Sequence, residues 1–347
     1  MRVAHVLRDD HAEHIGGDVA QLRASVDALR TLGIDAFATS VDDLRAPIDV
    51  VHLYNLQLPV QLARARLRAA RVVPSAPVVL SPIYWPMDRA AVRMERTDSY
   101  ALRALHALGP KRRGEWLLNR HALSGAAAVL PNSEIEASRV SSYFRLPRTP
   151  GWHVVPNGLW VDRWEVERAA HSGPLEVACI ARLEPQKNQT RLVSAVQGME
   201  GAKLTLVGPA GDERYAKVAL DALSSLGARG RWIPRLAQPE LRSLLSSIDV
   251  HVLPSFRETP GLASMEAAMA GCRIVVTREG SAEEYFGELA EYADPRSVDD
   301  IRSAILRAAE KPGQHGLTDR MRRYDWSRVG ERLSRVYGEV ICASGAG

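Results

Sequence analysis

Two glutamates frame a candidate anion site in the second half of the chain. Glu258 and Glu266 are separated by seven residues within PSFRETPGLASMEAAMAG, which follows an apolar run at residues 250–253. The run predicts a buried strand. Thr259 and Pro260 predict the N-cap and the first residue of a helix. The pattern is therefore strand, polar turn, helix, with a carboxylate on either side of the helix start.

The first turn of a helix leaves backbone N–H groups free, and the helix dipole adds partial positive charge there, so a diphosphate can bind. Gly261 and Leu262 fall in that turn, and Gly261 has no side chain to keep an anion away. The glutamates would repel phosphate, so they suit hydroxyl groups at either end of a diphosphate. From spacing alone, two solvated glutamates remain an alternative.

A second candidate cluster is cationic. Arg182 and Lys187 are five positions apart in ARLEPQKNQTRLVSAV, directly after LEVACI at residues 175–180, which predicts a strand. Two cations at a helix start can clamp phosphate, Arg bidentately and Lys as a point charge; two exposed side chains are the alternative. KLTLVGPAGD places Gly208 at the exit of another strand, where it predicts a close approach of the backbone to a nucleotide.

The first half opens with a β-α-β unit. A strand at residues 2–7 leads to a helix with apolar residues at helical spacing, Val19, Leu22, Val26 and Leu29, and then to a second strand, IDAFATS. Gly16 and Gly17 precede the helix. The fingerprint G-x-G-x-x-G is absent, which argues against a nicotinamide enzyme.

Two further strands end in polar and aromatic residues. IDVVHLYN ends near His52 and Asn55, and PVVLSPIYWPMD leads to Tyr84, Trp85 and Asp88. Open α/β sheets bind ligands at the carboxyl ends of their strands, so these side chains are candidates for an acceptor site. His52 could equally be a packing histidine, and the aromatic pair could stack on a sugar ring or cap the sheet.

Four motifs together resemble those of a known family. They are E-x7-E at Glu258 and Glu266, ARLEPQKN around Arg182, VPNGLWVD at residues 155–162, and the helix-spaced YDWSRVGERLSRVYGEV at 324–340. The chain resembles the retaining glycosyltransferases of the GT-B fold, family GT4, also called glycosyl transferases group 1. The usual Gly before Arg182 is Ala181 here.

This resemblance implies the fold class and the domains. An α/β GT-B fold has two Rossmann-like β/α/β domains facing across a cleft, with a C-terminal helix that crosses back to the first domain. We expect an acceptor-binding domain at 1–160, a nucleotide-sugar-binding domain at 161–325 and the returning helix at 326–347.

The resemblance also implies roles at the donor. In the family, the first glutamate of the motif contacts the donor sugar and the second contacts the ribose, so Glu258 and Glu266 are expected to do the same. Arg182 and Lys187 are expected to bind the diphosphate, with Glu258 as the third catalytic residue.

Other positions carry weaker expectations. Arg235 falls in the loop that reads the base in the family, and Gly16 and Gly17 match a Gly pair near the donor phosphates and acceptor. Many members have a His or a His-Asp pair at the exit of the fourth strand. This chain has Tyr84, Trp85 and Asp88 in that stretch instead, which leaves its acceptor-side base undefined.

The expected activity is transfer of a sugar, with retention, from a UDP- or GDP-linked donor to a hydroxyl acceptor. We expect no cofactor beyond this co-substrate and no metal, since no D-x-D triplet occurs. A catalytically silent sugar-nucleotide-binding or scaffold subunit and a GT-B epimerase remain alternatives. No nucleic-acid-binding module is visible.

Charge and cysteines bear on location. The formal net charge is +4, but residues 60–120 hold twelve Arg and Lys against four Asp and Glu. Such a region attracts anionic membranes, unless it is only a solvated Arg-rich face. Three cysteines far apart indicate a reducing compartment, so we expect a cytoplasmic protein, with peripheral contact at the inner face of the membrane left open.

Overall fold

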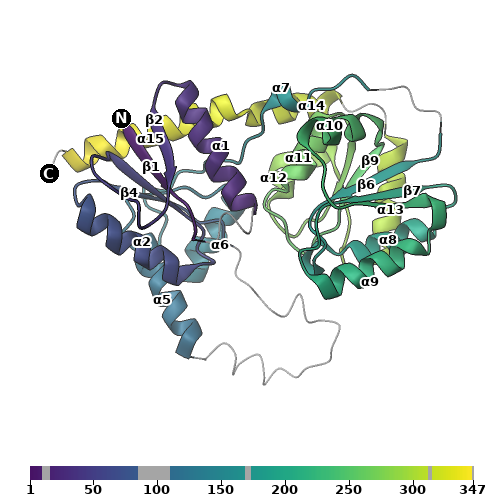
Figure 1. Cartoon of the computed structure of the whole chain (residues 1–347), viewed down its shortest axis with the longest axis horizontal. Helices are drawn as coiled ribbons and strands as arrows, with labels where there is room; N and C mark the ends of the chain where they lie inside the picture. Colours follow the sequence, from purple (N-terminus) through teal and green to yellow (C-terminus); the bar gives the residue numbers. More distant parts are fainter. Residues whose placement is uncertain (10–15, 85–109, 169–172, 312–314, 346–347) are drawn as a thin grey trace. The chain divides into compact units, whose positions relative to one another are not determined.

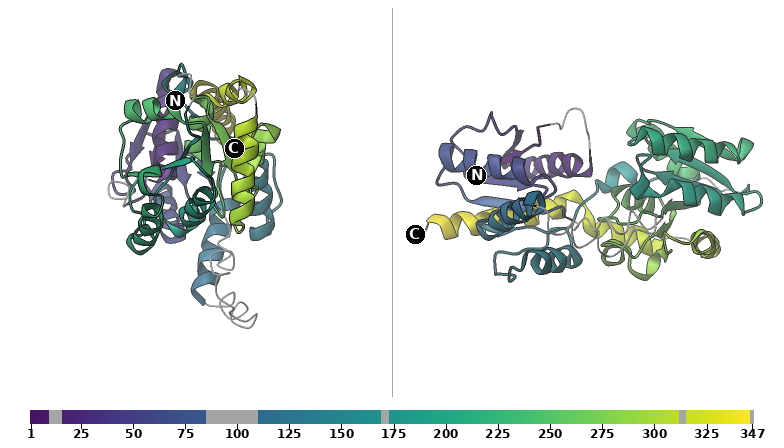
Figure 2. Two further views of the ribbon diagram at one scale, coloured as in Figure 1. Left: turned by 90° about the vertical axis from the view of Figure 1, so that its right-hand side faces the viewer. Right: turned by 90° about the horizontal axis from the view of Figure 1, so that it is seen from below.

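The computed structural model describes residues 1–9, 16–84, 110–168, 173–311 and 315–345 (Figure 1). Trp85 and Asp88 lie outside this range, as do residues 85–109 of the basic region. Contacts divide the chain into two compact units, Met1–Gly158 with Trp326–Gly347, and Leu159–Asp325. Figure 2 shows helices on both faces of the sheet in each unit.

The first unit is built on a parallel sheet in the order β2-β1-β3-β4-β5. Its strands are β1 (Arg2–Val6), β2 (Asp35–Thr39), β3 (Val50–Tyr54), β4 (Val78–Ser81) and β5 (Ala128–Val129). The chain adds β2 on one side of β1 and later strands on the other. The strand order therefore reverses between β1 and β3.

Among the described residues, the helices that accompany this sheet are α1 (Gly17–Thr31), α2 (Pro59–Val72), α5 (Pro110–Ser124), α6 (Glu134–Phe144) and α15 (Trp326–Gly345). Helix α1 buries Val19, Leu22, Val26 and Leu29, as its periodicity predicts. Helix α15 lies beside α1 (Figure 1). Gly330 permits this contact, because a Cβ there would lie 3.1 Å from the Cβ of Ala28. The C-terminal helix thus belongs to the first unit.

The second unit has a parallel sheet in the order β11-β10-β9-β6-β7-β8. Its strands are β6 (Glu176–Ile180), β7 (Lys203–Val207), β8 (Gly230–Ile233), β9 (Val250–Leu253), β10 (Arg273–Val276) and β11 (Glu291–Tyr292). Here the order reverses between β6 and β9. All four residues of β9 are buried, as expected for a central strand of a doubly wound sheet.

The helices of this unit are α7 (Val161–Trp164), α8 (Gln189–Gln197), α9 (Glu213–Ser224), α10 (Gln238–Ser247), α11 (Leu262–Met269), α12 (Ala282–Phe286), α13 (Val298–Glu310) and α14 (His315–Met321). Figure 1 shows α10 and α11 on one side of the sheet and α8, α9 and α13 on the other. The apolar residues between these layers form one continuous core.

The two ends of the second unit are hydrogen-bonded to each other. The Leu159 N–H donates to the Tyr324 carbonyl at 2.9 Å, and the Val161 N–H donates to the Asp325 carboxylate at 3.1 Å. The chain therefore enters and leaves this unit at one place. No helix among the described residues is both long enough and apolar enough to cross a membrane.

Candidate functional site

The candidate site of the second unit lies where its strand order reverses. In an open α/β sheet, ligands usually bind at this point, beside the loops that leave the carboxyl ends of the strands, here β6 and β9. The β6 loop carries Arg182 and Lys187, and the β9 loop carries Glu258. Residues far apart in the sequence thus meet at one point of the fold.

Lys187 and Glu258 form a close ion pair. Lys187 Nζ lies 2.5 Å from Glu258 Oε2, and both side chains are largely shielded from solvent. The Ser255 hydroxyl donates to the same carboxylate oxygen at 3.1 Å. Two donors therefore fix the Glu258 carboxylate, while the lysine ammonium retains protons that can bind another anion.

Further contacts lock the β6 and β9 loops together. The Phe256 N–H donates to the Gln186 carbonyl at 2.9 Å, and Gln186 Nε2 donates to the Arg257 carbonyl at 3.2 Å. Buried Asn188 has a positive φ of 60° and its Nδ2 donates to the carbonyls of Pro254 and Pro295. Sequence reasoning missed Asn188, although Asn is among the few residues that adopt this conformation readily.

Gly280 supports Glu258 from the loop after β10. The Glu258 N–H donates to the Glu279 carbonyl, and the Glu258 carbonyl accepts from the Ser281 N–H, both at 3.1 Å. Gly280 has a φ of 145°, and a Cβ on it would lie 2.0 Å from the Glu258 carbonyl oxygen. Only glycine, which lacks a Cβ, fits at position 280 against the backbone of Glu258. The sequence motifs gave no sign of this position.

Arg182 lies nearer the surface. Its guanidinium forms an ion pair with Glu184 at 3.3 Å, and half of the side chain is exposed. Exposed pairs of this kind contribute little stability, so Arg182 can exchange Glu184 for another anion at low cost. The sequence motifs did not single out Glu184.

Gly208 permits close contact between two strand exits. It has a φ of 139°, and a Cβ on it would lie 2.2 Å from the Ala181 carbonyl oxygen. The backbone that approaches Gly208 is therefore that of the residue before Arg182. Trp232 Nε1 donates to the Gly208 carbonyl at 3.0 Å and ties the end of β8 to the same place. Arg235 is exposed on the loop that follows β8.

Helix α11 begins two residues later than its sequence predicts. Thr259 and Pro260 are not its N-cap and first residue: Gly261 is the N-cap, with a φ of 85°, and Leu262 is the first helical residue. The prediction was wrong because the left-handed backbone at Gly261 redirects the chain, so the residues before it cannot be helical. The helix ends at Met269, and Gly271, with a φ of 80°, directly follows its C-cap Ala270.

Glu266 lies on α11, beyond its first turn. Its side chain is half-buried, and loss of contact with water raises its pKa to about 8. Burial therefore favours the protonated form of this carboxyl. The structure gives Glu258 and Glu266 distinct environments: the first is paired with a cation, and the pKa of the second is raised by burial.

The first unit has a pocket at its own reversal point, between β1 and β3. Arg8 Nε lies 3.5 Å from Asp18 Oδ2, and Asn55 Nδ2 donates to the same oxygen at 2.9 Å. Gly16 lies directly beside them, since a Cβ on it would be 2.7 Å from Asp18 Oδ1, whereas a Cβ on Gly17 would meet nothing within 4 Å. The pocket, which Arg8, Asp18 and Asn55 line together with apolar side chains, has a volume of about 30 Å³, the room of about two water molecules.

His52 does not reach this pocket. It is buried, its Nδ1 lies 2.6 Å from the Tyr337 hydroxyl on α15, and its Nε2 lies 2.9 Å from the Ser81 hydroxyl. Burial, with a contribution from neighbouring His5, holds the pKa of His52 well below its usual range. The structure thus gives His52 the role of a neutral packing residue.

Tyr84 packs against α6. Its ring centroid lies 5.2 Å from that of Phe144 and 5.7 Å from that of Tyr143. Its N–H donates to Glu136 Oε1 at 2.7 Å. Tyr84 therefore caps the end of β4. Sequence reasoning missed Arg8 and Asp18, which line the pocket of the first unit.

Comparison with known proteins agrees with this architecture. Residues 162–325 match the family model for glycosyl transferases group 1. A glycogen synthase of Mycobacterium tuberculosis is 28% identical over an alignment of 197 residues, which covers 53% of this chain and 47% of that protein. The aligned part of this chain thus covers less than half the length of that relative.

Solved structures are similar over nearly the whole chain. A sucrose-phosphate synthase from Thermosynechococcus elongatus aligns with a TM-score of 0.79 and 14% identity over 99% of both chains. HepE of Anabaena, solved in complex with UDP-glucose, aligns with a TM-score of 0.71 and 15% identity over 98% of this chain and 100% of that one. These likenesses establish the expected GT-B fold. Residues 162–325, which lie within the second unit, therefore match the domain of the glycosyl transferases group 1.

Proposed function

We propose that the chain transfers a sugar, with retention, from a nucleoside-diphosphate sugar to a hydroxyl acceptor. The observation that carries the proposal is the Lys187–Glu258 pair at the reversal point of the second sheet. The resemblance of this chain to the GT4 motifs supports it. So does HepE of Anabaena, which was solved with UDP-glucose, and a UDP- or GDP-linked donor would suit this site.

The donor diphosphate would bind to cations and to the start of α11. Arg182 would leave Glu184 for a phosphate oxygen, and Lys187 would add a phosphate to its contact with Glu258. The free N–H groups after Gly261 would add partial positive charge. As the bond to the sugar breaks, charge grows on the leaving phosphate, and these groups would stabilise it without a metal.

The two glutamates would hold the ends of the donor. Glu258, fixed by Lys187 and Ser255, would accept hydrogen bonds from sugar hydroxyls. Glu266 would do the same for the ribose after losing its proton. Retention would follow if the acceptor attacked the same face of the sugar that the phosphate leaves. The acceptor oxygen would bond to the anomeric carbon as the bond from that carbon to the phosphate oxygen breaks. The proton of the acceptor hydroxyl would pass to the departing phosphate.

Binding of nucleoside diphosphates in the presence of EDTA tests this site. We expect one of UDP and GDP to bind to the full chain, as measured by calorimetry, and Lys187→Ala to weaken binding at least about tenfold, since a charge-assisted hydrogen bond contributes about 1.5–3 kcal/mol. Lys203→Ala is the matched control. Lys203 also pairs with a glutamate, Glu176, at 2.9 Å, but at the opposite ends of the strands.

Turnover separates binding from chemistry. Glu258→Ala should abolish sugar transfer from the bound donor and leave the affinity for the diphosphate within about threefold of wild type. If Lys203→Ala weakened binding as much as Lys187→Ala, or if no diphosphate bound without a metal, the assignment of the donor site would fail.

A further inference from the structure

Helix α2 exposes large aliphatic side chains on its solvent side. Val60 and Leu67 are 70% and 62% exposed. Arg64 and Arg71 share their face, because the four positions follow the spacing i, i+4, i+7 and i+11. The opposite face of α2, with Leu62, Ala65 and Ala69, packs into the core. The outer face is therefore both apolar and basic.

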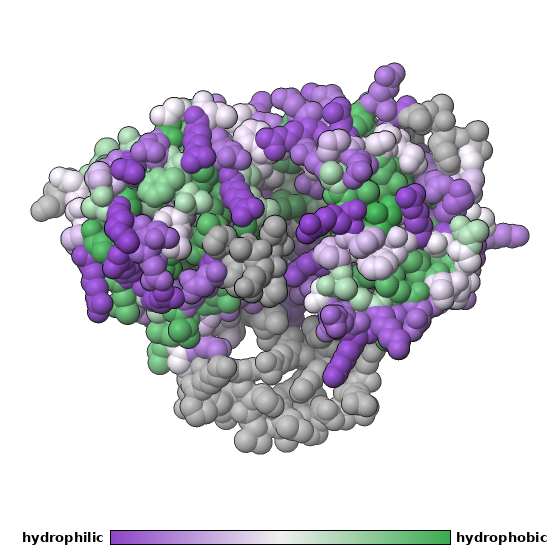
Figure 3. Space-filling model, in the orientation of Figure 1, coloured by the Kyte–Doolittle hydropathy of each residue, from purple (hydrophilic) through white to green (hydrophobic). Residues whose placement is uncertain are grey.

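Helix α5 extends this surface. It packs against α2, and Arg66 of α2 donates to the carbonyls of His121 and Gly125 at its end. Leu117 and Leu118 of α5 are 59% and 37% exposed. Figure 3 shows hydrophobic and hydrophilic atoms interspersed over this part of the first unit. We call Val60, Arg64, Leu67, Arg71, Leu117 and Leu118 the α2–α5 face.

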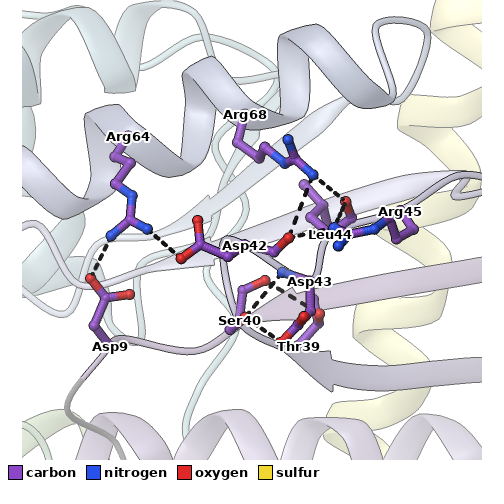
Figure 4. A network of polar contacts seen from close by, with 9 residues as sticks. All are labelled: Asp9, Thr39, Ser40, Asp42, Asp43, Leu44, Arg45, Arg64 and Arg68. Carbon is purple, nitrogen blue, oxygen red and sulfur yellow. Dashed lines mark hydrogen bonds and ion pairs between the residues drawn. The ribbon is translucent and has the colours of Figure 1, made fainter.

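The positive charge near this face is compensated only in part, by Asp9 and Asp42. Helix α2 contains four arginines and no acidic residue. Arg66, Arg68 and Arg120 donate to main-chain carbonyls, which leaves their charge in place. Within the described part of the chain, Arg71 makes no ion pair. Arg64 is the exception, since it bridges Asp9 and Asp42 at 2.9 and 2.6 Å (Figure 4).

We propose that the α2–α5 face binds the surface of an anionic lipid bilayer. Aliphatic side chains would enter the boundary of the acyl chains while guanidinium groups meet lipid phosphates. Charge complementarity favours this occupant over a second copy of the chain. A two-fold dimer would place the same basic surface against itself, and like charges would repel. The proposal is independent of the proposed transfer reaction.

Co-sedimentation of the full chain with vesicles tests the proposal. We expect binding to vesicles that contain phosphatidylglycerol, weaker binding as salt is raised, and little binding to pure phosphatidylcholine. Leu67→Glu and Leu117→Glu should each weaken binding at least about tenfold, and Arg71→Gln about fivefold. All three side chains are exposed, so melting temperatures should stay near that of wild type.

Val218→Glu is the control, because Val218 of α9 is 59% exposed, like Leu117, but belongs to the second unit. Its binding to vesicles should match wild type within about twofold. Equal losses for Val218→Glu and Leu117→Glu, or equal binding of wild type to both lipids, would overturn the proposal. It would also fail if the wild type proved dimeric and Leu67→Glu made it monomeric, because the face would then be an interface between copies.

Discussion

Glu266 links the candidate site to pH. Burial raises its pKa from 4.5 to about 8, so the folded chain binds this proton more tightly than the unfolded chain does. The protonated carboxyl therefore contributes stability that is fully present below pH 4.5 and is lost as the pH rises through 8.

Replacing Glu266 with glutamine removes this dependence. We expect Glu266→Gln to become more stable relative to wild type as the pH rises from 5 to 9, because the amide need not lose a proton. Urea unfolding of both proteins at several pH values measures the difference. A difference that did not change with pH would contradict the raised pKa.

Gly280 makes a second prediction at this scale. Gly280→Ala should lower the free energy of unfolding by roughly 3 kcal/mol or more, because its Cβ would meet the Glu258 carbonyl at 2.0 Å in a strained backbone. Gly201→Ala is the control: Gly201 also has a positive φ, of 75°, but open space around it, so the loss there should be about 1 kcal/mol.

Thermal or urea unfolding compares the two glycine variants. Activity offers a second measurement, since Gly280→Ala should also displace Glu258 and reduce sugar transfer, whereas Gly201→Ala should not. Equal losses of stability in both would mean that the contact with Glu258 is unimportant.

The sequence identified the residues of the candidate site better than their contacts. The motifs single out Lys187 and Glu258, but they assign one to phosphate and the other to sugar. Their ion pair depends on how two loops separated by some seventy residues interlock. The raised pKa of Glu266 and the burial of His52 likewise depend on packing by distant segments, which no local pattern records.

At the scale of elements, helix α15 requires a glycine at one position but has room for a larger side chain at another. Gly330 and Gly338 both lie within α15. A Cβ at Gly330 would lie 3.1 Å from the Ala28 Cβ and carbonyl oxygen of α1, whereas one at Gly338 would meet nothing within 4 Å.

The two glycines should therefore respond oppositely to alanine. Gly338→Ala should stabilise the first unit by about 0.5–1 kcal/mol, because alanine favours the helix. Gly330→Ala should lose about 1–3 kcal/mol relative to Gly338→Ala, because it forces α15 away from α1. Unfolding followed by circular dichroism measures both. If Gly330→Ala were as stable as Gly338→Ala, the close packing of the two helices would be wrong.

Periodicity predicted most elements but not every boundary. The apolar spacing of α1 and the apolar run of β9 predicted a helix and a buried strand, because each apolar side chain packs into a core. Both predictions were confirmed. The start of α11 was placed too early, because Thr259 and Pro260 are good local signals for a helix start. The positive φ of Gly261 overrides these signals. Glycine adopts both positive and negative φ readily, so its presence in the sequence does not predict which one occurs.

At the scale of the whole molecule, the two ends of the second unit are bonded to each other. Leu159 and Asp325 form a parallel bridge, and the Leu159 and Val161 N–H groups bond to Tyr324 and Asp325. The donor-site candidates Arg182, Lys187, Glu258 and Glu266 all lie between these ends. Glycosyltransferase motifs in the sequence predicted two α/β domains, but these terminal hydrogen bonds have no sequence signature.

Residues 159–325 should consequently fold when they are expressed alone. The fragment has its own core and paired ends, so we expect a single cooperative transition in urea. Asp325→Ala, which removes the acceptor of the Val161 N–H, should destabilise the fragment by about 1 kcal/mol or more.

The fragment also tests where the donor diphosphate binds. If Arg182, Lys187 and the start of α11 are sufficient, its affinity for the preferred nucleoside diphosphate should lie within about threefold of that of the full chain, while sugar transfer should be lost with the first unit. Calorimetry on both proteins makes the comparison. A folded fragment without affinity would show that residues of the first unit hold the diphosphate, whereas an unfolded one would show that the closure at Leu159 and Asp325 does not suffice for independent folding. The two results are distinguished by circular dichroism before any ligand is added.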